Sequence, residues 1–144
     1  MAKFFGEVPN DLIKVFDELE TNVPMMMGKM CKAGATVVYN KVRKNLGKAF
    51  SRTATLLKGL KITNVYKTSD GGINVHVGFY GYNADKKTNK HPKGVPIPLI
   101  AMAREYGTAS GEGKVPFLRK SFAKKDIEAA MLEVQKEFIN EDNE

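Results

Sequence analysis

The chain has 144 residues, of which 42% are hydrophobic and 27% are charged, and its formal net charge is +7. This composition is typical of one folded domain and excludes general disorder. No apolar run approaches the roughly 20 residues of a membrane span, and we expect neither a signal peptide nor a membrane segment. The single cysteine, Cys31, excludes an internal disulfide and a cysteine-rich metal site, and its helical surroundings indicate a small buried residue.

Two helices are predicted in the first third of the chain. Asn10 can cap a first helix that ends near Asn22, because apolar residues recur there at spacings of three and four. Pro24 suits the first turn of a longer second helix, which Gly47 closes. The apolar stripe of this second helix is broken only at Lys41. Residues 48–60 are ambiguous, and their leucines fit a short helical turn before a strand.

An antiparallel hairpin is predicted over residues 61–80. Apolar Ile73, Val75, Val77 and Phe79 alternate with more polar neighbours, which is the two-residue repeat of a half-buried strand. The preceding segment is rich in β-branched and aromatic residues, and 69–72 supplies the turn. The lysine-rich stretch 81–96 has little that is apolar, so we expect a mobile loop there.

The remainder is predicted to be helical. One helix covers 97–106 and ends at Gly107, for which we expect a left-handed conformation. A mobile loop of small residues, 108–115, precedes a helix from Pro116 to about residue 140, with Asp126 as a possible cap of a restart. The acidic residues 140–144 are expected to fray. The predicted fold is a single α+β domain, 1–144, with a long N-terminal helix packed on a small antiparallel sheet and with C-terminal helices.

Groups that could converge for catalysis are few. His76 lies on the polar side of its strand and His91 lies in the lysine-rich loop, with no partner at a spacing typical of a triad or a metal pair. The segment Gly107–Lys114 resembles a phosphate-binding loop only superficially, because its glycine spacing is one residue too long and Val115 replaces the hydroxyl. We therefore predict no enzyme, and no catalytic, cofactor-binding or metal-binding residue.

The charge is distributed unevenly along the chain. Residues 21–69 contain ten lysines and arginines and no acidic residue, whereas the last eight residues include four acidic ones. Such asymmetry suits either nucleic acid or contact between copies of the chain. The sequence carries no recognised nucleic-acid-binding motif, and lysines on the outer side of an amphipathic helix are usually a solvated face. The candidate basic surface comprises Lys41, Arg43, Lys44, Lys48 and Arg52.

The most informative feature is a helix, a stop and a short loop followed by a proline. The 97–106 helix ends in the segment Glu105-Tyr106-Gly107-Thr108. A new helix is predicted to start eight residues after Thr108, in the segment Pro116-Phe117-Leu118-Arg119. We call these two segments the joint. We predict that the joint is a contact surface with exposed aromatic residues at Tyr106 and Phe117. Its candidate interface residues are Glu105, Tyr106, Gly107, Thr108, Pro116, Phe117, Leu118 and Arg119.

In these segments the chain resembles the small tail-component proteins of long-tailed bacteriophages. The resemblance extends from about Ala33 to Ser121 and includes the end of the long helix, the 56–60 turn and both strands. It implies an α+β structural protein of the virion neck that joins or completes the tail at the head–tail interface. It also implies a homo-oligomeric ring, with a hexamer favoured, contacts with other phage neck or tail proteins, and assembly in the host bacterial cytoplasm.

Two other functions stay open. The first is a tail terminator, a ring that caps the tail tube. The second is a basic nucleic-acid-binding protein, although no specific nucleic-acid sequence is expected as a partner. Phage and prophage origins are equally compatible with the sequence, and no membrane partner is expected.

Overall fold

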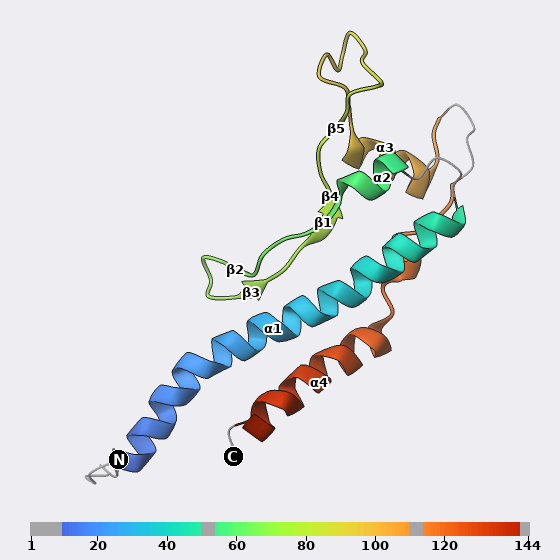
Figure 1. Cartoon of the computed structure of the whole chain (residues 1–144). Coiled ribbons are helices and arrows are strands. Elements are labelled where there is room, and N and C mark those ends of the chain that lie inside the picture. The colour runs from blue at the N-terminus through green and yellow to red at the C-terminus, as the bar shows by residue number, and fades with distance from the viewer. Residues whose placement is uncertain (1–9, 50–53, 110–113, 142–144) are drawn as a thin grey trace, which may run out of the picture.

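The computed structural model describes residues 10–49, 54–109 and 114–141 (Figure 1). It has a long helix, a set of short antiparallel strands and further helices after them, so the predicted α+β fold is confirmed. The chain runs through α1 (Asn10–Ala49), α2 (Ala54–Gly59), β1 (Leu60–Ile62), β2 (Tyr66–Lys67), β3 (Ile73–Asn74), β4 (Val77–Phe79), β5 (Tyr82–Asn83), β6 (Val95–Pro96), α3 (Ile97–Tyr106), the 3₁₀ turn η1 (Arg119–Ser121) and α4 (Lys124–Glu141).

The two predicted N-terminal helices are one continuous helix, so the predicted break near Asn22 is wrong. Pro24 lies inside α1. Proline removes one backbone hydrogen bond and displaces the carbonyl four residues earlier, which bends a helix without always ending it. Figure 1 accordingly shows a change of direction in the blue part of α1. The apolar residues keep the same helical phase on both sides of Pro24, and this common phase is compatible with one helix.

The predicted 61–80 hairpin is confirmed, with an interruption in its middle. Near its base β1 pairs with β4, with Ile62 opposite Val77. Near its tip β2 pairs with β3, with Tyr66 opposite Asn74. Ile62 and Tyr66 are four residues apart, whereas their partners Val77 and Asn74 are three residues apart. The first strand therefore contains a bulge of one residue.

The bulge turns part of the hairpin towards α1. Thr63 and His76 exchange hydrogen bonds across it: the Thr63 N–H donates to the His76 carbonyl at 2.9 Å and the His76 N–H donates to Thr63 Oγ1 at 2.8 Å. Val65, in the extra stretch, lies against Gly28, where an added Cβ would stand 3.2 Å from Val65 Cγ1. The small residue at 28 thus lets the hairpin approach the helix.

Residues 81–96, where we predicted a mobile loop, form a second hairpin. Its ends pair as β5 and β6, and Thr88 and His91 exchange backbone hydrogen bonds nearer its tip. Gly94 is required by this geometry, because its φ is +111° and a Cβ there would lie 2.2 Å from the Asn83 carbonyl oxygen. This second hairpin extends away from α1 and α4 (Figure 1). The mobility of 81–96 stays a prediction.

The predicted helix from Pro116 is also corrected. Residues 114–118 are not helical, η1 covers only Arg119–Ser121, and α4 starts at Lys124. Asp126 lies in the first turn of α4 and pairs with Lys41 of α1, so it does not cap a restart. The backbone stays helical through Glu141, beyond the expected start of fraying at residue 140, and 142–144 lie outside the described residues.

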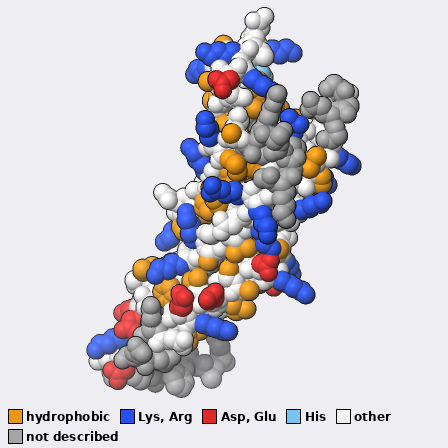
Figure 2. Space-filling view, turned by 45° about the vertical axis from the view of Figure 1, so that its right-hand side comes forward, with side chains coloured by type: hydrophobic (Ala, Val, Ile, Leu, Met, Phe, Trp, Pro, Cys, Tyr) orange, Lys and Arg blue, Asp and Glu red, His pale blue; other side chains and the backbone are white. Residues whose placement is uncertain are grey.

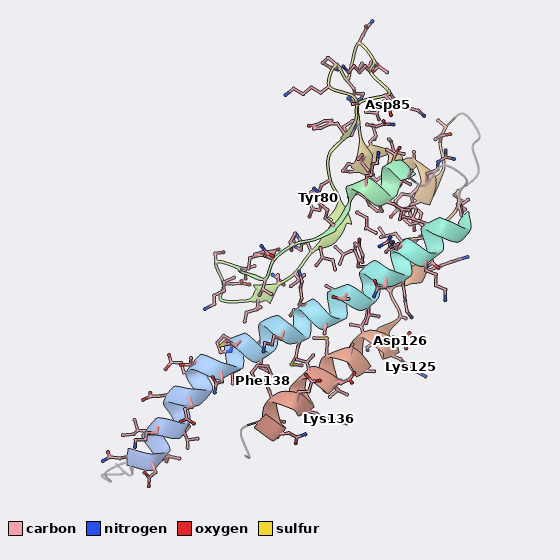
Figure 3. All side chains as sticks on the ribbon, viewed as in Figure 1. Tyr80, Asp85, Lys125, Asp126, Lys136 and Phe138 are labelled. Carbon is pink, nitrogen blue, oxygen red and sulfur yellow. The ribbon has the colours of Figure 1, made fainter. Side chains whose placement is uncertain are left out.

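Helix α4 runs antiparallel to α1 along one side of it (Figures 1 and 3). A Cβ at Gly34 would lie 3.1 Å from Ile127 and 3.4 Å from Met131, so these two side chains pack directly on the α1 backbone. Further along, Lys29 Nζ lies 4.7 Å from the centre of the Phe138 ring. These contacts fix the alignment of the two helices.

The buried core lies at the C-terminal end of α1. It is built from apolar residues of α1, α2, β1, α3 and the segment before η1: Val38, Val42, Leu46, Leu56, Leu60, Ile97, Ala101 and Phe117. The joint is therefore part of the core, and it is not an appendage.

Candidate functional site: the joint between α3 and η1

Glu105 is the centre of the joint. It stands on the last turn of α3 and its side chain is 2% exposed. One carboxylate oxygen, Oε2, accepts hydrogen bonds from the N–H groups of Phe117 at 2.8 Å and Leu118 at 2.9 Å. The other, Oε1, accepts from the Arg119 N–H at 3.2 Å and from Arg119 Nε at 2.9 Å. A single carboxylate thus satisfies three successive backbone donors and one guanidinium.

These hydrogen bonds determine the charge state of Glu105. Burial raises the pKa of this carboxyl, but the hydrogen bonds from the Leu118 N–H, the Arg119 side chain and the Phe117 and Arg119 N–H groups outweigh it. The net effect is a pKa below the usual range of a glutamate. The carboxylate is therefore ionised at neutral pH and serves as a structural acceptor.

The joint is also attached to α1. Ser121, which is fully buried, donates from Oγ to the Phe117 carbonyl at 2.6 Å, and Asn45 Nδ2 of α1 donates to Ser121 Oγ at 3.0 Å. The Phe117 ring packs edge-on against Phe79 of β4, with centroids 5.9 Å apart. Helix α1 and strand β4, together with Glu105 of α3, therefore hold residues 117–121 in one position.

An apolar face covers the outside of the joint. Leu99, Met102 and Tyr106 of α3 follow one another at spacings of three and four, and each is exposed. The Arg119 guanidinium lies 5.4 Å from the centre of the Tyr106 ring. Beneath this face is a hollow of about 170 Å³, bounded by Met102, Tyr106, Phe117, Leu118 and neighbours on α3 and β4.

The predicted interface residues differ in their exposure. Tyr106 and Arg119 are exposed, as a contact surface requires, and Thr108, Pro116 and Leu118 are half-buried. Phe117 is 1% exposed, so the prediction of an exposed aromatic there is wrong. Its ring completes the core because the hydrogen bonds to Glu105 pull the backbone of 117–119 against α3.

Gly107 has the positive φ that the sequence predicts. Its φ is 83° and its ψ is 173°. The ψ value lies outside the left-handed helical region, in a region that only glycine occupies readily. Beyond it, the Val115 N–H donates to the Arg104 carbonyl at 2.9 Å, which brings the two sides of the 108–115 loop together. Residues 110–113 of that loop lie outside the described residues, and its mobility stays a prediction.

Replacing Gly107 by valine is expected to destabilise the protein by about 1 to 2 kcal/mol or more, because a Cβ clashes with the backbone at this φ. The measurement is a thermal melt of Gly107→Val beside Ala109→Val, a control at an exposed position of the same loop. Equal melting temperatures for the two variants would contradict the expectation.

Three side chains of the candidate basic surface, those of Lys41, Arg43 and Lys44, are described. Arg43 and Lys44 are exposed on α1, whereas Lys41 is half-buried and paired with Asp126 of α4. Lys48 lies in α1, but its side chain is outside the described part, as is Arg52. On the face in Figure 2, Lys and Arg side chains are scattered along the molecule among hydrophobic ones.

The histidines offer no site among the described residues. His76 is exposed and hydrogen-bonds with the Tyr66 hydroxyl across the hairpin, and His91 closes the bridge to Thr88. Cys31 is half-buried, where a buried residue was predicted. Within 10–49, 54–109 and 114–141, no three His, Cys, Asp or Glu side chains gather closely enough to hold a metal ion. No helix in the same ranges is long and apolar enough to cross a membrane.

Sequence reasoning missed four residues that pack around the joint. Asn45 and Ser121 are ordinary polar residues in the sequence, and only the fold brings them together. Leu99 and Met102 could have been found, because with Tyr106 they form an apolar stripe at helical spacing next to a second, buried stripe on α3.

No protein-family model, no curated protein and no solved structure matches this chain.

Proposed function

We propose that this protein is a structural component of a bacteriophage neck, which joins or completes the tail at the head–tail interface as a homo-oligomeric ring. It acts in the virion after assembly in the host cytoplasm, and its partners are further copies of itself and other neck or tail proteins. It needs no cofactor and performs no catalysis.

One observation carries the proposal. The two motifs of the phage resemblance, Glu105–Thr108 and Pro116–Arg119, are held together by one buried carboxylate, Glu105. On the outside of that rigid unit, an apolar stripe and a hollow face solvent. A rigid scaffold with an exposed apolar patch is typical of a protein–protein contact.

The experiment is a deletion of the gene in the phage or prophage that encodes it, followed by electron microscopy of the lysate. We expect filled heads and separate tails, and restoration of joined particles by the wild-type gene supplied in trans. Overlong tails would favour the tail terminator, because a tube without its cap continues to grow. Normal joined particles from the deletion would contradict both functions.

The alternative in another class is nucleic-acid binding, and salt dependence separates it. We expect duplex DNA to bind only in the range of about 10⁻⁴ to 10⁻⁶ M at physiological salt, and binding to vanish as salt rises, because scattered lysines make only non-specific phosphate contacts. Fluorescence anisotropy over a salt series measures this. Nanomolar affinity at physiological salt would favour the nucleic-acid function.

A further inference from the structure

The first part of α1 extends beyond its partner helix. Phe138 of α4 lies beside Lys29, and α4 ends at Glu141, so residues 10–23 of α1 project past it (Figures 1 and 3). We call residues 10–23 the overhang.

The overhang presents the same side of α1 that α4 covers elsewhere. Phe16 precedes Gly34 by 18 residues, which is five turns of an α-helix, so both point to one side. At Gly34 that side is packed by Ile127 and Met131. At Phe16 it is open: the side chain is 58% exposed, and Leu12, Ile13 and Val15 are exposed beside it. An apolar helical face of this size requires a partner.

The hollow at the joint has the size and lining to receive an aromatic side chain. Its volume is about 170 Å³. A buried apolar cavity of about 150 Å³ is known to accept benzene. Phe79, Met102, Phe117 and Leu118 line it together with Glu105, whose carboxylate oxygens are occupied by hydrogen bonds. Exposed Leu99 extends the apolar surface along α3.

The charges of the two surfaces are opposite. The overhang carries four acidic side chains, Asp11, Asp17, Glu18 and Glu20, against one basic side chain, Lys14. The described residues of α3 and of 114–121 carry four basic side chains, Arg104, Lys114, Arg119 and Lys120, against Glu105 alone. In Figure 2 most acidic side chains accordingly lie in the lower half, towards the two chain ends, whereas basic ones reach the top. Two overhangs would repel each other, but an overhang and a joint attract.

We propose that the overhang of one copy docks on the joint of the next copy, with Phe16 inserted in the hollow beneath Met102 and Tyr106. The contact is heterologous, because one copy contributes its overhang and the other its joint. Repetition of a heterologous contact closes a ring or extends a filament. This inference rests on the proposed function, because it supplies the subunit contact of the proposed ring.

Site-directed crosslinking tests the contact on the full chain. In a Cys31→Ser background, Phe16→Cys and Met102→Cys are made as separate proteins and mixed with a short bismaleimide. We expect a crosslinked dimer in the mixture and little in either protein alone. Leu132→Cys, at an exposed apolar position of α4, is the control and should not crosslink to Phe16→Cys. Crosslinking of Phe16→Cys to itself would overturn the proposal, because it would place overhang on overhang.

Sedimentation equilibrium gives the strength of the contact. Loss of a central aromatic anchor is expected to weaken self-association at least about tenfold in Phe16→Ala, and Leu132→Ala should leave it unchanged. A wild-type protein that stays monomeric at high concentration would overturn the proposal. So would a Phe16→Ala variant that melts lower without a change in mass, because Phe16 would then pack within its own copy.

The same variants separate this inference from the proposed function. If the gene deletion is rescued by wild type and equally by Phe16→Ala, the neck function stands and the docking contact is wrong. If the deletion leaves particles normal while the crosslink forms, the contact stands and the neck function is wrong.

Discussion

Replacing Glu105 by alanine is expected to lower the free energy of unfolding by about 3 to 5 kcal/mol, one of the two largest single effects in this protein. The substitution removes the acceptor of three backbone N–H groups, at Phe117, Leu118 and Arg119, and of the Arg119 guanidinium. The buried Phe117 N–H would be left without a partner and cannot reach water without opening the core, whereas the exposed Arg119 side chain can. Urea unfolding at neutral pH measures the loss.

Glu105→Gln is the matched variant, because it keeps the shape but offers one acceptor oxygen where the carboxylate offers two. We expect this variant to lower the free energy of unfolding by about 1 to 3 kcal/mol. Glu128→Ala, at an exposed position paired with Lys124 at 3.7 Å, is the control and should change stability by less than about 0.5 kcal/mol. Similar unfolding curves for Glu105→Ala and Glu128→Ala would show that the hydrogen bonds to Glu105 contribute little.

The lowered pKa of Glu105 adds a pH dependence with a definite sign. A carboxyl with a depressed folded-state pKa stabilises the fold above its unfolded-state pKa and loses that contribution as the pH falls through the folded-state pKa. The stability difference between wild type and Glu105→Gln should therefore be constant near neutral pH and shrink in acid, below the ordinary glutamate range. A difference that stays constant in acid would contradict this assignment.

Replacing Phe117 by alanine is the second large change, with an expected loss of about 3 to 5 kcal/mol. The ring is 1% exposed and packs on Phe79, so its removal leaves a cavity between β4, α1 and α3. Phe122→Ala is the matched control, since Phe122 lies five residues later and is 63% exposed. Calorimetry should show a large drop in melting temperature for the first variant and a small one for the second, and equal drops would place Phe117 outside the core.

Local signals predicted much of the fold. Helix α3 has the predicted bounds because prolines begin it and a glycine with positive φ ends it. The hairpin followed from strict alternation over Ile73 to Phe79, which only a half-buried strand produces. The break at Pro24 was predicted wrongly, because proline weakens a helix locally whereas the continuous apolar face of α1 acts along its whole length.

The end of α3 at Tyr106 and the positive φ of Gly107 were predicted correctly, but the arrangement of the residues around them was not. Charged residues are rarely buried, so composition gave no sign that Glu105 is buried, and Phe117 was predicted to be exposed. The arrangement depends on contacts between residues far apart in the sequence, such as Asn45 with Ser121. No local pattern reports such contacts.

Because of the hydrogen bonds of Glu105, the stability of the fold depends little on the length of the 107–115 segment. They fix the chain on both sides of that segment, so the ends of the loop meet whatever lies between them. The entropic free-energy cost of closing a flexible loop rises only slowly with its length, by about 0.6 kcal/mol for each doubling. Insertions after Ala109 are thus inexpensive, and the segment is a natural place for variation in length between related chains or for an engineered tag.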